Sequence, residues 1–108
     1  MNLFKKLQER AAAANPIRVG MIGAGKFGTM FLAQALRIPA IHVVSVVDLN
    51  PTNARSNMKL VGWADEAYGA DSIHEAAISG KTYVGEDWEA LVAHQAVDIV
   101  IEATGNPL

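Results

Sequence analysis

IRVGMIGAGKFG, residues 17–28, decides the fold of this chain. Its first half is a short, mostly apolar run, which is typical of a strand buried on both faces. Its second half matches G-x-G-x-x-G. A helix is predicted from Gly25 to Arg37, ahead of Pro39, with an inward face of Phe27, Phe31, Ala35 and Ile38. A glycine motif between a strand and a helix is the context in which those glycines have a defined task.

Each motif glycine has a separate predicted task. Gly23 permits a tight turn out of the strand, Gly25 lets the backbone approach a pyrophosphate, and Gly28 allows close packing of helix on strand. Backbone N–H groups and the positive end of the helix dipole stabilise phosphates at such a helix N-terminus. The residues expected to bind the pyrophosphate of a dinucleotide are Gly23, Ala24, Gly25, Lys26, Phe27 and Gly28.

A second strand, nearly continuous in β-branched residues, is predicted from Ile41 to Asp48. Asp48 lies twenty residues beyond the last motif glycine, where an acid accepts hydrogen bonds from the adenosine ribose hydroxyls. A carboxylate at this place favours NAD over NADP, because it repels a 2′-phosphate. The preference between NADH and NADPH stays open, since compensating contacts are available from Asn50, Asn53 and Arg55.

The remaining chain alternates helices and strands, which predicts a parallel sheet. The expected elements are a helix opened by Pro51, a short helix capped by Asp71 or Ser72 and closed by Gly80, and then strand 81–85, helix 87–94 and strand 97–102. Trp88, Leu91 and Val92 are expected to turn inward from the last helix. The predicted fold class is α/β, a Rossmann-type doubly wound parallel sheet, incomplete at about four strands and preceded by an N-terminal helix.

The end of the fourth predicted strand is a second candidate part of the site. In a doubly wound sheet, ligands bind beyond the carboxyl ends of the strands, and this end should lie near the glycine loop. Ala103, Thr104 and Gly105 are therefore candidates to line the ribose and nicotinamide side. The alternative is an ordinary strand-to-helix turn.

The histidines, the tryptophans and the lack of cysteine do not indicate a metal site or a catalytic site. The three histidines lack metal-ligand spacing, so no metal is expected, and no residue can be assigned a catalytic role. Trp63 and Trp88 are interpreted as packing residues. The chain has no cysteine, which excludes disulfides and thiolate chemistry and is compatible with the cytoplasm.

Composition limits the remaining function classes. The 108 residues are 51% hydrophobic and 19% charged, as in one soluble domain, and a net charge of −2 argues against nucleic-acid binding. The apolar runs fall short of the roughly 20 residues that cross a bilayer, so no membrane partner is expected. Leu3, Phe4, Leu7 and Ala11 predict an amphipathic helix rather than a signal peptide. We expect residues 1–16 to be this helix and a linker, and residues 17–108 to be the N-terminal part of a dinucleotide-binding domain.

Residues 17–107 resemble a known family in three segments: RVGMIGAGKFG, the strand that ends at Asp48, and VDIVIEATG. They resemble the N-terminal domain of homoserine-dehydrogenase-like NAD(P)-dependent oxidoreductases, and within that group the bacterial branch with deoxyxylulose-5-phosphate-reductoisomerase-like enzymes. The resemblance implies a cytoplasmic homo-oligomer that transfers hydride between NADPH or NADH and a small carbonyl or alcohol. It also implies that Gly23, Gly25, Gly28 and Asp48 contact the cofactor.

Members of that family continue for several hundred residues into a substrate and dimerisation domain that supplies the catalytic groups. We therefore expect this chain to be a fragment that binds a dinucleotide without turnover. One alternative is a nucleotide-sensing regulatory module of the potassium-transport type, which also has a similar glycine loop followed by an acid. Another is a domain that kept the fold and lost its ligand.

Overall fold

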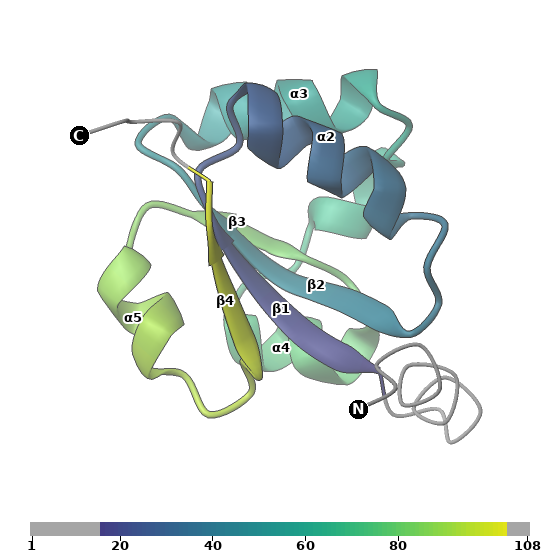
Figure 1. Ribbon diagram of the computed structural model, residues 1–108. Coiled ribbons are helices and arrows are strands. Elements are labelled where there is room, and N and C mark those ends of the chain that lie inside the picture. The colour runs from purple at the N-terminus through teal and green to yellow at the C-terminus, as the bar shows by residue number, and fades with distance from the viewer. Residues whose placement is uncertain (1–15, 104–108) are drawn as a thin grey trace, which may run out of the picture.

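The computed structural model describes residues 16–103, whose strands form one four-stranded parallel sheet (Figure 1). The strands are β1 (Ile17–Ile22), β2 (Ile41–Val47), β3 (Tyr83–Gly85) and β4 (Ile99–Glu102), and their order in the sheet is β3-β2-β1-β4. Every neighbouring pair is parallel, so all four carboxyl ends meet at one edge. The predicted Rossmann-type α/β fold is confirmed. The helix expected before residue 16, and Thr104 and Gly105, lie outside the described residues.

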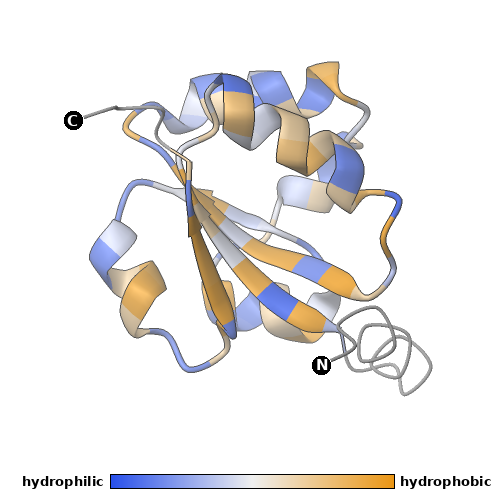
Figure 2. Ribbon diagram, in the orientation of Figure 1, coloured by the Kyte–Doolittle hydropathy of each residue, from blue (hydrophilic) through white to orange (hydrophobic). Residues whose placement is uncertain are grey.

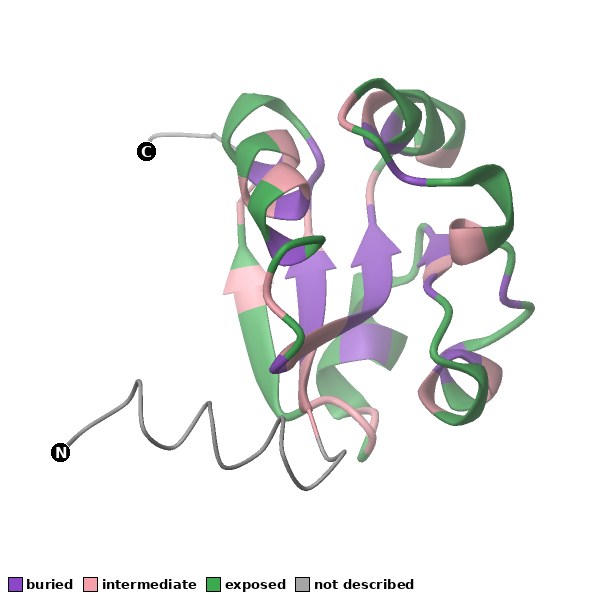
Figure 3. Ribbon diagram, turned by 90° about the vertical axis from the view of Figure 1, so that its right-hand side faces the viewer, coloured by how far each residue is buried: buried purple, intermediate pink, exposed green. Residues whose placement is uncertain are grey.

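Helices cover both faces of the sheet (Figure 1). The first face carries α2 (Lys26–Ala35) and α3 (Pro51–Leu60), and the second carries α4 (Ile73–Ser79) and α5 (Trp88–Ala93). A 3₁₀ helix, η1 (Asp65–Tyr68), precedes α4. Figure 2 shows the apolar strands between the helix layers, and Figure 3 shows β1 and β2 as the most deeply buried part. No helix between residues 16 and 103 has the length and hydropathy of a membrane span.

An irregularity in β2 changes which of its residues face each of the two cores. Val43 and Val46 belong to the α2/α3 core, whereas Val44 and Val47 belong to the α4/α5 core. Strict alternation would not produce this pattern; the pairing of β2 with β1 shifts by one residue just before Ser45. Because both faces are covered, β2 is apolar almost throughout, as its sequence predicted.

The starts of α3 and α4 and the end of α4 follow the predicted signals Pro51, Ser72 and Gly80, and Asn50 is a cap that was not predicted. Asn50 accepts the Asn53 N–H at 3.1 Å ahead of Pro51, and Ser72, rather than Asp71, accepts the Glu75 N–H at 3.0 Å. Gly80 closes α4 in the left-handed conformation, with φ of 82°. Asn50 and Ser72 thus each satisfy one of the amides that these helices leave unpaired, and the Gly80 N–H donates to the Ala76 carbonyl at 3.0 Å.

The rotation of α2 differs from the prediction, which placed Phe27 on the inward face. Phe27 is 68% exposed, and the buried residues of the helix are Gly28, Leu32 and Ala35. A Cβ at Gly28 would lie 2.5 Å from the Gly23 carbonyl oxygen, so this glycine must face the sheet. Successive helical residues are about 100° apart, which turns Phe27 away. The helix also ends at Ala35, before the predicted end.

Candidate functional site

A cleft of about 650 Å³ opens at the carboxyl edge of the sheet. It is lined by the ends of β1, β2 and β4 and by α5, with side chains and backbone from Ile22, Gly23, Gly25, Val47, Asp48, Leu49, Asn53, Glu86, Trp88, Val92 and Glu102. This size is ordinary for a small-molecule site. A smaller hollow of about 410 Å³, lined in part by Pro39, Gly80 and Trp63, contains none of the predicted cofactor-binding residues. Gly23, Gly25 and Asp48, which are predicted to bind the cofactor, line the cleft instead.

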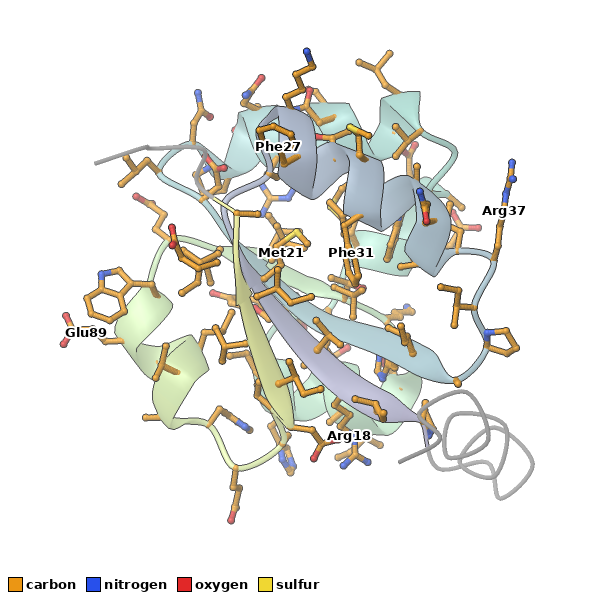
Figure 4. The ribbon with its side chains drawn as sticks, in the orientation of Figure 1. Arg18, Met21, Phe27, Phe31, Arg37 and Glu89 are labelled. Carbon is orange, nitrogen blue, oxygen red and sulfur yellow. The ribbon has the colours of Figure 1, made fainter. Side chains whose placement is uncertain are left out.

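The glycine loop has the predicted shape. Gly23 adopts φ of 94°, a conformation that favours glycine, and its N–H donates to the Val47 carbonyl at 2.7 Å. Gly28 is in contact with that turn, as described above, and Met21 lies below the start of α2 (Figure 4). A Cβ at Gly25, in contrast, would meet no atom within 4 Å. The loop is thus tightly packed at Gly28 and open at Gly25, where a pyrophosphate would need space.

Ala24 is held by hydrogen bonds from three directions. Its N–H donates to Asp48 Oδ2 at 2.8 Å, and its carbonyl oxygen accepts from Thr29 Oγ1 and Asn57 Nδ2, each at 2.9 Å. The residue after β2, α2 and α3 therefore hold the two peptide groups on either side of Ala24. Sequence reasoning missed Thr29 and Asn57. The available signal was that Asn57, a polar residue, lies next to Met58 on the buried side of α3.

Asp48 joins the loops at the centre of the cleft. Besides Ala24, it accepts the Asn50 N–H through Oδ1 at 2.8 Å, and its own N–H donates to the Gly85 carbonyl at 2.9 Å. The residue is half-buried. Each carboxylate oxygen has two lone pairs, so Asp48 keeps acceptor capacity for ribose hydroxyls after making these bonds. Its position agrees with the predicted ribose contact, which stays a prediction.

The side chains that line the cleft make it acidic. They include the carboxylates Asp48, Glu86 and Glu102, and none of the described residues that line it is a lysine or an arginine. Of the residues expected to offer compensating contacts to a 2′-phosphate, Asn53 lines the cleft. Arg55 instead donates to the Val84 carbonyl at 3.3 Å and lines an adjoining hollow. The local charge therefore opposes an additional phosphate at Asp48.

The end of β4 lies where it was expected. The Ala103 N–H donates to the Ile22 carbonyl at 2.7 Å, which places Ala103 beside the start of the glycine loop. Glu102 contributes to the cleft wall. A contact of Ala103 with the cofactor remains a prediction.

The interpretation of Trp88 and Val92 as inward-facing residues is wrong. Trp88 is 53% exposed and Val92 51% exposed, and both line the cleft, whereas Leu91 is fully buried. Leu91 packs over Gly20, where a Cβ would lie 2.7 Å from Leu91 Cδ2, and this contact sets the rotation of α5. Trp63 packs as predicted, with its indole N–H donating to the Leu32 carbonyl at 3.0 Å.

Two of the three histidines form hydrogen bonds with backbone groups. His42 Nε2 donates to the Lys81 carbonyl at 2.6 Å, and His94 Nδ1 accepts the Ala96 N–H at 3.1 Å. His74 is exposed. Between residues 16 and 103 no group of three histidine or carboxylate side chains is arranged to hold a metal ion.

Comparison with known proteins connects this geometry to a family. A family model described as an oxidoreductase family with an NAD-binding Rossmann fold matches residues 17–108. The match includes the glycine loop, Asp48 and every strand of the described sheet. No curated protein matches the chain.

Proposed function

Since the chain belongs to this oxidoreductase family with an NAD-binding Rossmann fold, we propose that its cleft holds a nicotinamide dinucleotide across the glycine loop. The contrast between Gly25 and Gly28 carries the proposal. Both glycines belong to one motif, but a Cβ would collide with backbone at Gly28 and would meet open space at Gly25. Packing explains the glycine at position 28, whereas the glycine at position 25 is explained by close approach of a ligand.

The residues present fit a dinucleotide. The first intrahelical bond of α2, from the Thr29 N–H to the Gly25 carbonyl, measures 2.8 Å, so the amides of residues 26–28 precede the helical ladder and suit a pyrophosphate. Asp48 offers acceptors to the adenosine ribose, and Ala103 lies on the side where the nicotinamide is expected. When bound, the nicotinamide would supply hydride chemistry, while these residues bind and orient it.

For the whole protein we propose hydride transfer between the cofactor and a small carbonyl or alcohol. The resemblance to homoserine-dehydrogenase-like and reductoisomerase-like enzymes supports this reaction, a separate substrate domain and a cytoplasmic homo-oligomer. The family match favours an oxidoreductase and lends no support to the alternative of a regulatory nucleotide sensor. A sensor would bind ATP and NADH with similar affinity, so competition between these ligands distinguishes the two functions.

Binding of NADH to Gly25→Asp tests the proposal. The new side chain finds open space, so the fold should persist while its carboxylate occupies the phosphate position. Like charges in contact cost several kcal/mol, so we expect roughly 100-fold weaker binding in a fluorescence titration. Gly69→Asp is the matched control, because Gly69 is also exposed and does not line the cleft. Unchanged affinity in Gly25→Asp would overturn the assignment of the phosphate loop.

A further inference from the structure

Three exposed apolar side chains gather at one end of the cleft. Trp88 is the first residue of α5, and Val92, four residues later, lies on the same side of that helix. Leu49, which directly follows Asp48, is 97% exposed and lines the same cleft. Burial of exposed apolar surface is favourable, so a flat apolar group of a ligand would gain binding free energy by covering these side chains.

The exposure of Trp88 follows from fixed packing of α5. Asp87 Oδ1 accepts the Ala90 N–H at 3.0 Å and so fixes where the helix begins. Leu91, buried over Gly20, fixes how the helix is rotated. Because the start and the rotation of α5 are both fixed, the indole of Trp88 lines the cleft.

We propose that Trp88 stacks on the adenine ring of the bound dinucleotide, an inference that rests on the proposed dinucleotide site. With the pyrophosphate at Gly25 and the adenosine ribose at Asp48, the base attached to that ribose continues past Asp48. Leu49 lies there, and so does the end of β3, because the Gly85 carbonyl accepts the Asp48 N–H. Trp88 follows β3 by three residues and is therefore on the adenosine side.

The sheet order separates this place from that of the other ring of the cofactor. β3 and β2 lie on one side of β1, and β4 lies on the other. The nicotinamide is expected near Ala103, at the end of β4, so Trp88 and the nicotinamide belong to opposite halves of the cleft. ADP-ribose, which lacks nicotinamide, should keep the contact with Trp88, and nicotinamide mononucleotide should not make it.

Tryptophan fluorescence and calorimetry test the stacking. The chain has two tryptophans, and Trp63 is only 8% exposed, so the emission of solvent-exposed indole comes from Trp88. We expect ADP-ribose to quench that emission in the unmodified chain. In Trp88→Leu, ADP-ribose should bind about 10-fold more weakly, because the apolar contact remains and the stacking is lost. Trp88→Phe should restore most of the affinity, since it keeps a ring.

Matched controls separate stacking from a general effect on α5. Glu89 is the next residue of the helix and points outward (Figure 4), so Glu89→Gln should bind ADP-ribose as the unmodified chain does. The affinity for nicotinamide mononucleotide should not change in Trp88→Leu. If that ligand, and not ADP-ribose, depends on Trp88, the indole contacts the pyridine ring and the adenine assignment is overturned.

The remaining outcomes distinguish this inference from the proposed function. If the unmodified chain binds neither NADH nor ADP-ribose, the dinucleotide site is wrong and the stacking falls with it. If NADH binds and Gly25→Asp abolishes that binding, the site stands. The stacking alone is refuted if ADP-ribose does not quench Trp88 in the unmodified chain and Trp88→Leu binds ADP-ribose as tightly as the unmodified chain.

Discussion

Asp48 has a structural role in the loops and, in the proposed function, a second role in recognition of the ribose. Its carboxylate accepts N–H groups from Ala24 and Asn50 and thereby joins the glycine loop to the turn after β2. In the proposed dinucleotide site, the same group would repel a 2′-phosphate. The twenty-residue spacing from the motif predicted the position of the acid, but not its backbone partners, because those depend on how two distant loops meet.

Asp48→Ala should therefore change stability and cofactor preference together. Two backbone donors lose a charged acceptor, so we expect the free energy of unfolding to fall by about 1–3 kcal/mol in chemical denaturation. NADH should bind more weakly, and the ratio of NADPH to NADH affinity should rise. Glu86→Gln, which removes a carboxylate from the same cleft, should leave stability nearly unchanged. An unaltered affinity ratio in Asp48→Ala would exclude the ribose contact.

At the scale of elements, most start and stop signals were predictable, although α2 ends before its predicted end, and helix rotation was predicted only in part. β1 and the caps of α3 and α4 agree with the sequence, since these depend on short local patterns. The rotation of α2 and of α5 is set by contacts at Gly28 and Gly20, where a missing side chain lets backbone or Leu91 approach. Hydrophobic periodicity gives a glycine no direction, so Phe27 in α2 and Trp88 and Val92 in α5 were predicted to face inward, whereas they are exposed.

Two helices also hold the glycine loop together, because Thr29 of α2 and Asn57 of α3 each donate one hydrogen bond to the Ala24 carbonyl. Thr29→Val and Asn57→Leu should each weaken NADH binding about two- to fivefold, because one donor to the carbonyl remains. The double variant should lose more than the product of the single effects, since the carbonyl then loses both side-chain donors. Calorimetric titration of all four proteins measures this coupling. Strictly multiplicative effects would show that the two side chains do not act on a shared loop.

Across the whole molecule, the parallel sheet gives the two edges different character. The carboxyl edge carries the glycine loop, Asp48 and the acidic cleft, whereas the opposite edge carries the smaller hollow near Pro39 and Gly80. The alternation of strands and helices was sufficient to predict this polarity, because parallel strands end together. The exposed apolar group of Trp88, Val92 and Leu49 was not predictable, since it arises only when the ends of β2 and β3 and the start of α5 come together at that edge.

Hydrogen–deuterium exchange with and without NADH tests this polarity. Binding should slow exchange at the amides of residues 23–28, at residues 48–50 and at the start of α5, because ligand contacts there suppress local opening. Exchange around Gly80 and Lys81 should stay unchanged, since these residues lie at the other edge. Gly25→Asp with the same NADH concentration provides the reference for non-specific effects. Protection confined to Pro39, Gly80 and Trp63 would place the ligand in the smaller hollow, and the carboxyl-edge cleft would no longer be the binding site.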